Sequence, residues 1–206
     1  MRKVLIVLLL CLVLPSLLIA AEDSAPKTRQ YAMGSQMFTF TAGPVLPAFF
    51  YRPFLPSSEG PKFLPFFDTH LKVGGFGSIR YQGFLSSTLA LGGELGYYFA
   101  YDRNDLFTSV PFQAKLTYIT LQGTFELPLS LGLGFAYNSY DQTSYMSLLV
   151  TGEVGFSWYF KEDWGLTLGT GLQLIPELYG KDSPNHTHTT LTGVMPITLS
   201  VTYRNN

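Results

Sequence analysis

The sequence has few charged residues and a single cysteine. Asp, Glu, Lys and Arg make up 13% of its 206 residues, well below the ~25% of ordinary soluble domains. Cys11 lies in an N-terminal apolar run, so the rest of the chain has no thiol for a disulfide or a Cys-ligated metal site. The net charge of −1 also disfavours nucleic acid as a partner, because nucleic-acid binding needs a basic surface.

Long apolar runs are absent beyond the N-terminus. After residue 21, no uninterrupted apolar stretch approaches the ~20 residues that a membrane-spanning helix needs. Hydrophobic residues nevertheless make up 47% of the chain and aromatic residues 16%. Since lipid leaves only helices and closed barrels as spanning structures, we expect a closed β-barrel.

The N-terminus has the layout of a secretory signal peptide. Two basic residues precede an apolar run that ends in Ala20-Ala21. We expect cleavage after Ala20 or Ala21, so that residues 1–21 are a signal peptide and residues 22–35 a short periplasmic segment. The alternatives are an uncleaved membrane anchor and a lipoprotein acylated at Cys11, which the apolar residues around that cysteine disfavour.

Period-2 alternation of apolar with polar or small residues runs through residues 36–206. In one stretch, Leu129, Leu131 and Leu133 alternate with Ser130 and Gly132. Eight strands are predicted, at residues 36–44, 69–81, 87–101, 110–121, 126–137, 145–160, 164–176 and 190–204.

The two faces of these strands indicate which side meets lipid. One face is mostly Leu, Val, Phe and Tyr, and the other is mostly Gly, Ser, Thr and Ala with isolated charges. This combination favours a narrow polar lumen and an apolar exterior, as in transmembrane barrels. A soluble periplasmic β-barrel binding protein, with bulky apolar groups inside, is the alternative.

The connections between the predicted strands alternate in length. Transmembrane barrels have long extracellular loops and short periplasmic turns, so both termini are expected in the periplasm. The predicted long connections are 44–68, 102–109, 138–144 and 177–189, and the predicted short ones are 82–86, 122–125 and 161–163.

Segments such as 129–135 and 197–203 carry a family resemblance. Over roughly residues 36–204 the chain resembles the small outer-membrane proteins of the OmpA transmembrane domain, OmpX and OmpW type. This resemblance implies an eight-stranded antiparallel transmembrane up-and-down β-barrel in the bacterial cell outer membrane. It also implies outer-membrane lipid, the barrel-assembly machinery and periplasmic chaperones as partners. One departure is that the family usually ends on an aromatic residue, whereas here Tyr203 is followed by residues 204–206.

Aromatic residues gather near the predicted strand ends. Such positions are typical of the interfacial girdles of membrane barrels. The predicted girdle consists of Tyr97, Phe99, Tyr101, Trp158, Phe160, Trp164 and Tyr203.

Polar residues on the predicted inner face form a candidate lumen network. Several lie at similar depth, about eight to ten residues from the nearest short turn. Because an eight-stranded barrel is barely wide enough for its own side chains, we expect ion pairs and hydrogen bonds to fill it. A polar permeation path is the alternative. The residues concerned are Lys72, Arg80, Glu94, Lys115, Glu153 and Gln173.

The connection 44–68 is unusual because it interleaves six prolines with aromatic residues. One hypothesis is that it covers the barrel mouth and offers an apolar surface to a lipid, a small hydrophobic ligand or a host surface molecule. The alternative is that the flanking strands simply extend outward, with their aromatic side chains packing on neighbouring loops. The candidate surface residues are Phe49, Phe50, Tyr51, Phe54, Phe63, Phe66 and Phe67.

Residues for catalysis are scarce. His186 and His188 could share a metal, but two exposed polar residues are the default, and we expect no metal or cofactor. There is no G-x-S-x-G or H-E-x-x-H motif, and His188 is followed by two threonines, where deacylase-like barrels have a serine. The chain is therefore not expected to be an enzyme.

The predicted function is that of an integral outer-membrane barrel with surface-exposed loops and a structural, adhesive or host-interaction role. The alternative is an OmpW-like, porin-like channel or transporter for small hydrophobic molecules. The soluble periplasmic binding protein is the second alternative.

Overall fold

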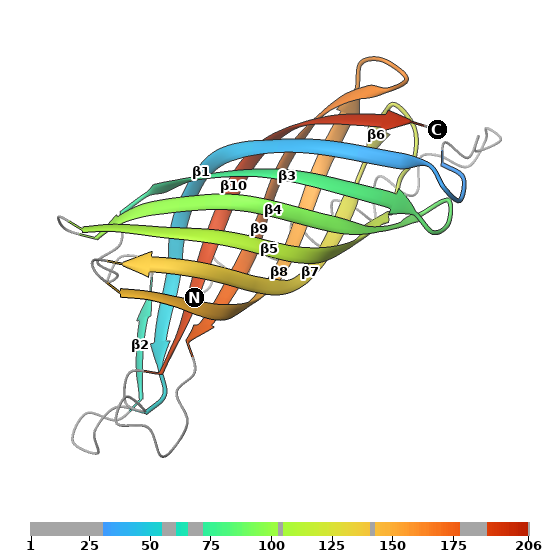
Figure 1. The fold of residues 1–206 in the computed structure, drawn as a ribbon. Helices are drawn as coiled ribbons and strands as arrows, with labels where there is room; N and C mark the ends of the chain where they lie inside the picture. Colours follow the sequence, from blue (N-terminus) through green and yellow to red (C-terminus); the bar gives the residue numbers. More distant parts are fainter. Residues whose placement is uncertain are drawn as a thin grey trace, which may run out of the picture.

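The protein is all-β (Figure 1). The structure is a computed structural model that describes residues 31–54, 61–65, 72–102, 105–140, 143–177 and 189–205. Eight long strands make up the barrel: β1 (Gln36–Arg52), β3 (Gly74–Phe84), β4 (Leu89–Asp102), β5 (Asp105–Ile119), β7 (Pro128–Tyr140), β8 (Thr143–Tyr159), β9 (Trp164–Glu177) and β10 (Thr190–Asn205). Two short strands accompany them, β2 (Lys62–Pro65) and β6 (Phe125–Glu126).

The long strands close into an antiparallel barrel. Each pairs with its neighbour in the order β10-β9-β8-β7-β5-β4-β3-β1, and β1 pairs back with β10. This closing seam runs from Gln36 opposite Asn205 to Tyr51 opposite Leu191. Over the length of these pairings the barrel wall has no unpaired edge, and the predicted fold is confirmed.

The apolar face of the strands points outward. On β7, Leu131 and Leu133 are 67% and 64% exposed, whereas Ser130 and Asn138 are buried inside. An exterior of exposed Leu, Phe, Val and Tyr side chains suits hydrocarbon, and the buried hydroxyls and amides suit a narrow lumen. The described part of the chain contains no helix long and apolar enough to cross a membrane.

The predicted girdle residues lie on the outer surface in two groups. Tyr97, Phe99 and Tyr101 follow each other along the outer half of β4, with ring centroids 6.4 and 6.3 Å apart. Near the inner end, the end that holds Gln36 and Asn205, Trp158 lies 6.0 Å from Phe160 and Trp164 lies 5.1 Å from Tyr203.

Several strands are longer at the outer end than the sequence predicted, whereas β3 begins at Gly74 instead of residue 69. β1 continues to Arg52, so the expected loop 44–68 is wrong over its first nine positions. The outer connections at 102–109 and 138–144 shrink to residues 103–104 and 141–142. The predicted alternation of long and short connections was therefore only partly right, because strand pairing continues into segments predicted as outer loops.

The barrel wall divides towards its outer end, as Figure 1 shows. β1 leaves β3 after Val45 opposite Gly74, and β9 leaves β8 after Leu174 opposite Val150. Beyond these points β9, β10, β1 and β2 stay paired with each other. We call this part the projecting sheet; it comprises residues 46–52, 62–65, 175–177 and 190–196.

Candidate functional site

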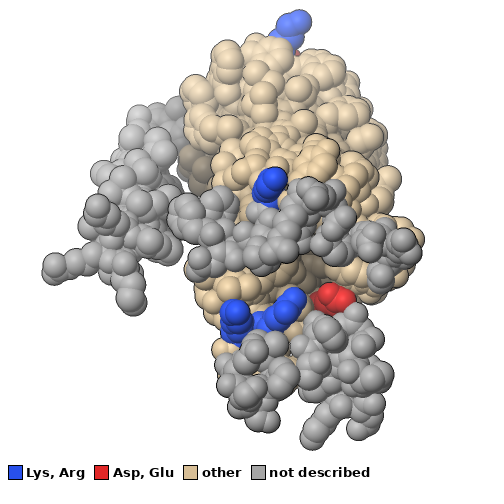
Figure 2. All heavy atoms as spheres, turned by 90° about the vertical axis from the view of Figure 1, so that its left-hand side faces the viewer, with Lys and Arg blue, Asp and Glu red and all other residues tan. Residues whose placement is uncertain are grey.

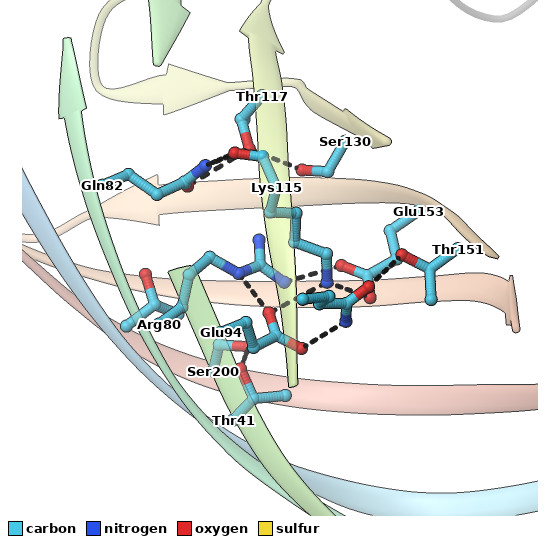
Figure 3. A network of polar contacts seen from close by, with 12 residues as sticks. Thr41, Arg80, Gln82, Glu94, Lys115, Thr117, Ser130, Thr151, Glu153 and Ser200 are labelled. Atoms are coloured by element: carbon cyan, nitrogen blue, oxygen red, sulfur yellow. Dashed lines mark hydrogen bonds and ion pairs between the residues drawn. The ribbon is translucent and has the colours of Figure 1, made fainter. Parts of the chain in front are cut away.

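A ring of four charged side chains crosses the middle of the lumen (Figure 3). Arg80 lies 2.5 Å from Glu94 and 2.7 Å from Glu153. Lys115 lies 2.9 Å from Glu94 and 2.5 Å from Glu153. Each cation therefore bridges both carboxylates, and the ring, which we call the charged layer, is electrically neutral.

Amides and hydroxyls surround the charged layer. Gln113 donates to Glu94 at 3.3 Å and accepts from Thr151 at 2.8 Å. Gln82 donates to the backbone carbonyl of Lys115 at 3.0 Å. Since Lys115 is fully buried, these partners satisfy groups that would otherwise be costly to remove from water.

The structure brings together four of the six predicted lumen residues, those of the charged layer. Gln173 is buried inside the barrel, but its amide nitrogen has no hydrogen-bond partner among the described residues. Lys72 lies before β3 and is exposed, so its assignment to the lumen network was wrong. Its backbone N–H still reaches the carbonyl of Tyr101, but at this height the wall has divided and no lumen encloses the side chain.

Sequence reasoning missed Gln82, Gln113 and Thr151. They share the inward parity of Arg80 and Lys115 on their strands. Alternation places them on the inward face, but parity alone does not show which inward residues contact the charges.

An apolar layer closes the lumen outside the charged layer. Phe76 is four positions further out than Arg80 on β3, and Tyr98 is four positions further out than Glu94 on β4. These side chains pack in one buried cluster of Val45, Phe76, Tyr98, Ala100, Ala136, Leu149, Ile175 and Val194. A polar solute would have to cross this cluster before it met the charges.

A cavity of about 60 Å³ lies in the lumen against the charged layer. It reaches from Glu126 and Tyr159 at the inner end, past Arg80 and Glu153, to Phe76 of the apolar layer. Ten of its lining residues are serines or threonines: Thr39, Thr41, Thr117, Ser130, Ser157, Thr167, Thr170, Thr198, Ser200 and Thr202. A space of this size, lined in part by hydroxyls, has room for a few water molecules; we call it the hydroxyl chamber.

The inner end of the barrel is also closed. Tyr31, Met37, Phe84, Ala90 and Ile119 form a second buried cluster there. The lumen is thus filled at three levels, by apolar side chains, by the charged layer and by the inner cluster.

The projecting sheet carries exposed aromatic and basic side chains. Phe63 on β2 stacks on Phe49 of β1 with ring centroids 5.5 Å apart, yet Phe63 stays 57% exposed and Phe54 46% exposed. Arg52 stands opposite Lys62 in the β1–β2 ladder, and both are exposed. In the outer view of Figure 2, basic side chains lie beside an acidic one at the lower part, where Figure 1 places β2.

The predicted aromatic surface is thus built mostly on strands. Phe50 and Tyr51 lie in β1 and are half-buried. Phe66 and Phe67 lie outside the described residues, as do His186 and His188. Within the described ranges no group of three or more His, Cys, Asp and Glu residues could hold a metal ion.

Comparisons with known proteins agree with this fold. A protein-family model matches residues 20–203, most of the chain. A protein of Borreliella burgdorferi, described as uncharacterized, is 31% identical over 121 residues, which cover 48% of this chain and 57% of that relative. The match therefore spans little more than half the length of this curated relative.

Among solved structures, Neisserial surface protein A (NspA) superposes with a TM-score of 0.55 at 14% identity, over 84% of this chain and 98% of that one. The outer membrane protein OprG from Pseudomonas aeruginosa superposes with a TM-score of 0.50 at 10% identity, over 86% of this chain and 99% of that one. At these identities the likeness concerns the fold alone. The chain belongs to the protein family that matches residues 20–203, and its fold is that of the small eight-stranded outer-membrane β-barrels.

Proposed function

We propose that this barrel is a non-enzymatic surface protein that binds an extracellular partner through the projecting sheet. The observation that carries the proposal is the continuation of β9, β10, β1 and β2 beyond the point where the barrel wall divides. A lumen filled at three levels leaves the outer surface as the part of the molecule available for contact.

The chemistry of the projecting sheet supports a binding role. Phe63 and Phe54 expose large apolar rings beside the basic pair Arg52 and Lys62. Like charges directly opposite each other destabilise a ladder, so a partner that brings negative charge would relieve their repulsion. Lysine and proline on β2 also protect an edge strand from unwanted pairing. Because this second role explains the lysine without a partner, the exposed aromatic rings are the better residues to test.

Substitution of these rings tests the proposal. Phe54→Ser with Phe63→Ser should weaken adhesion of barrel-expressing cells to host cells or matrix, and lower the binding of an apolar fluorescent dye by the purified protein. Phe160→Ser, which removes an exposed ring at the inner end, is the matched control. Equal adhesion and dye binding by all three proteins would contradict the proposed surface.

Transport of small hydrophobic molecules is the second candidate. The separation of β8 from β9 beyond Val150 and Leu174, beside the apolar layer, offers a lateral route into lipid that avoids the charged layer. A disulfide between Leu149→Cys and Ile175→Cys, both in that layer, should then block uptake of a hydrophobic solute. The same link between residues 151 and 173, which already pair in the ladder, should leave uptake unchanged.

A soluble periplasmic binding protein is disfavoured by the exposed apolar exterior; extraction from membranes by carbonate alone would support it.

The targeting predictions remain part of this proposal. Residues 1–21 are proposed as a signal peptide cleaved after Ala20 or Ala21, and both chain ends as periplasmic. Outer-membrane lipid, periplasmic chaperones and the barrel-assembly machinery are the proposed partners in biogenesis. N-terminal sequencing of the protein from outer membranes tests the cleavage site.

A further inference from the structure

A short segment before β1 folds back across the inner end of the barrel. Residues 31–35 turn at Gly34, whose φ of 94° lies in the left-handed region that glycine tolerates. We call residues 31–35 the strap. Gly34 N–H donates to the Phe84 carbonyl at 2.9 Å, and Phe84 N–H donates to the Ser35 carbonyl at 2.8 Å. The Tyr31 ring stacks on Phe84 with centroids 3.9 Å apart, and Tyr31 is only 2% exposed.

The Tyr31 hydroxyl is held between the buried side chains of Glu126 and Arg204. It donates to the Glu126 carboxylate at 2.9 Å and accepts from Arg204 Nη1 at 3.1 Å. Arg204 Nη1 also lies 2.7 Å from Glu126 Oε1. The Arg204 guanidinium stacks 3.7 Å over the ring of Tyr159.

Arg204 therefore joins four parts of the inner end. Its side chain reaches the strap at Tyr31 and the β5–β7 connection at Glu126. It also donates to the carbonyl of Glu162 at 2.5 Å, in the β8–β9 connection. The arginine itself stands near the end of β10. A residue after the last aromatic of the chain thus closes the barrel's inner end.

The same groups border the hydroxyl chamber. Glu126 and Tyr159 line its inner end, so the Tyr31–Arg204 contacts separate the chamber from the inner side. The strap lies outside the barrel ladder, whereas the charged layer stands on four ladder strands. The strap can therefore open locally without breaking the strand pairing of the barrel.

We propose that Tyr31, Glu126 and Arg204 form a releasable latch that controls access from the inner side to the hydroxyl chamber. When the strap withdraws, water and small polar solutes enter the chamber, while the charged and apolar layers keep the outer side closed. This device is separate from the binding surface proposed for the outer end, and either can fail without the other.

Thiol accessibility tests the latch in the folded full-length chain. Cys11, the single cysteine, is replaced by serine, and Ser200→Cys places a reporter in the chamber wall, where Ser200 is buried. The probe is methyl methanethiosulfonate, which adds one small thiomethyl group, read by intact mass. We expect slow labelling with the latch intact and labelling about tenfold faster or more after Tyr31→Ala or Arg204→Ala, because each variant frees the strap.

A control variant separates the latch from general loosening. Tyr203→Ala alters the neighbour of Arg204 that packs outside on Trp164, and it should keep slow labelling. Fast labelling with the latch intact, or equal acceleration by Tyr203→Ala, would overturn the proposal.

A milder variant covers the case in which Tyr31→Ala fails to fold, judged by loss of heat-modifiable gel mobility. Tyr31→Phe keeps the stack on Phe84 and removes only the hydroxyl, and it should still accelerate labelling. Labelling at the unaltered rate by folded Tyr31→Phe and folded Arg204→Ala would refute the latch.

Discussion

Arg80 and Glu94 stand directly opposite each other on β3 and β4, and their side chains meet at 2.5 Å inside the barrel. Lys115 and Glu153 complete the ring from β5 and β8. The charged layer thus combines a pair fixed by strand register with a pair brought together only by curvature of the wall. Its energetic role can be measured by removing one charge at a time.

Lys115→Met should strongly destabilise the barrel. The substitution leaves two carboxylates facing one guanidinium in a buried site, which costs about 3–5 kcal/mol. Urea unfolding in lipid vesicles, followed by tryptophan fluorescence, measures the change. Lys161→Met, at an exposed position in the β8–β9 connection, should stay within about 0.5 kcal/mol. Adding Glu153→Gln to Lys115→Met should recover part of the lost stability. Unchanged stability of the Lys115→Met variant would contradict the ring of ion pairs.

Leu131→Arg tests whether the exterior contacts hydrocarbon. Leu131 is 67% exposed, so in water an arginine there would be nearly neutral. In a bilayer a charge on the lipid face costs about 2–4 kcal/mol near the midplane. Unfolding from vesicles should show this loss for Leu131→Arg and almost none for Leu131→Met. Equal stability of both variants would indicate that this face is not in lipid.

Gly92 and Gly93 are adjacent on β4 but should respond oppositely to alanine. A Cβ at Gly92 would overlap the backbone carbonyl of Tyr81 on β3, whereas a Cβ at Gly93 would have nothing within 4 Å. We expect Gly92→Ala to cost about 1–3 kcal/mol or to prevent folding, because the strands must move apart. Gly93→Ala should fold normally. Heat-modifiable gel mobility and urea midpoints compare the two, and equal behaviour would contradict the close approach of β3 and β4.

The latch should loosen as pH rises. Burial raises the pKa of Glu126, which lies in an inner connection outside the spanning strands, from 4.5 to about 7, and outweighs the lowering by Tyr31 and Arg204. The protonated carboxyl is therefore favoured in the folded latch. Its stabilisation is present below the ordinary pKa and is lost as pH rises through about 7.

Hydrogen exchange of the strap amides, corrected for the intrinsic effect of pH, measures this loss. Protection of residues 31–35 should fall between pH 5 and 8 by about tenfold or more. Glu126→Gln, which cannot ionise, should keep protection constant over the same range. Protection that increases with pH would indicate that the ion pair with Arg204 outweighs burial.

Much of the fold was predictable because alternation is a local property. Each strand's inward and outward residues follow from a period of two, as Leu131 and Ser130 illustrate. The depth of Glu94, Lys115 and Glu153 could likewise be counted from nearby turns. The sequence did not reveal where β1 ends, because hydrogen bonding to β10 and β2 carries it past Pro44 and Pro47 to Arg52.

By itself, the sequence determined an antiparallel barrel with an apolar exterior and charges inside, since side-chain parity follows from covalent geometry alone. Only the tertiary structure decided which charges meet. Contacts between Arg80 and Glu153, or between Tyr31 and Arg204, depend on the register and closure of the whole wall. The strap before β1 carried no periodic signal. Arg204 has the inward parity of Ser200 and Thr202, but its contacts exist only once the barrel's first and last strands are joined.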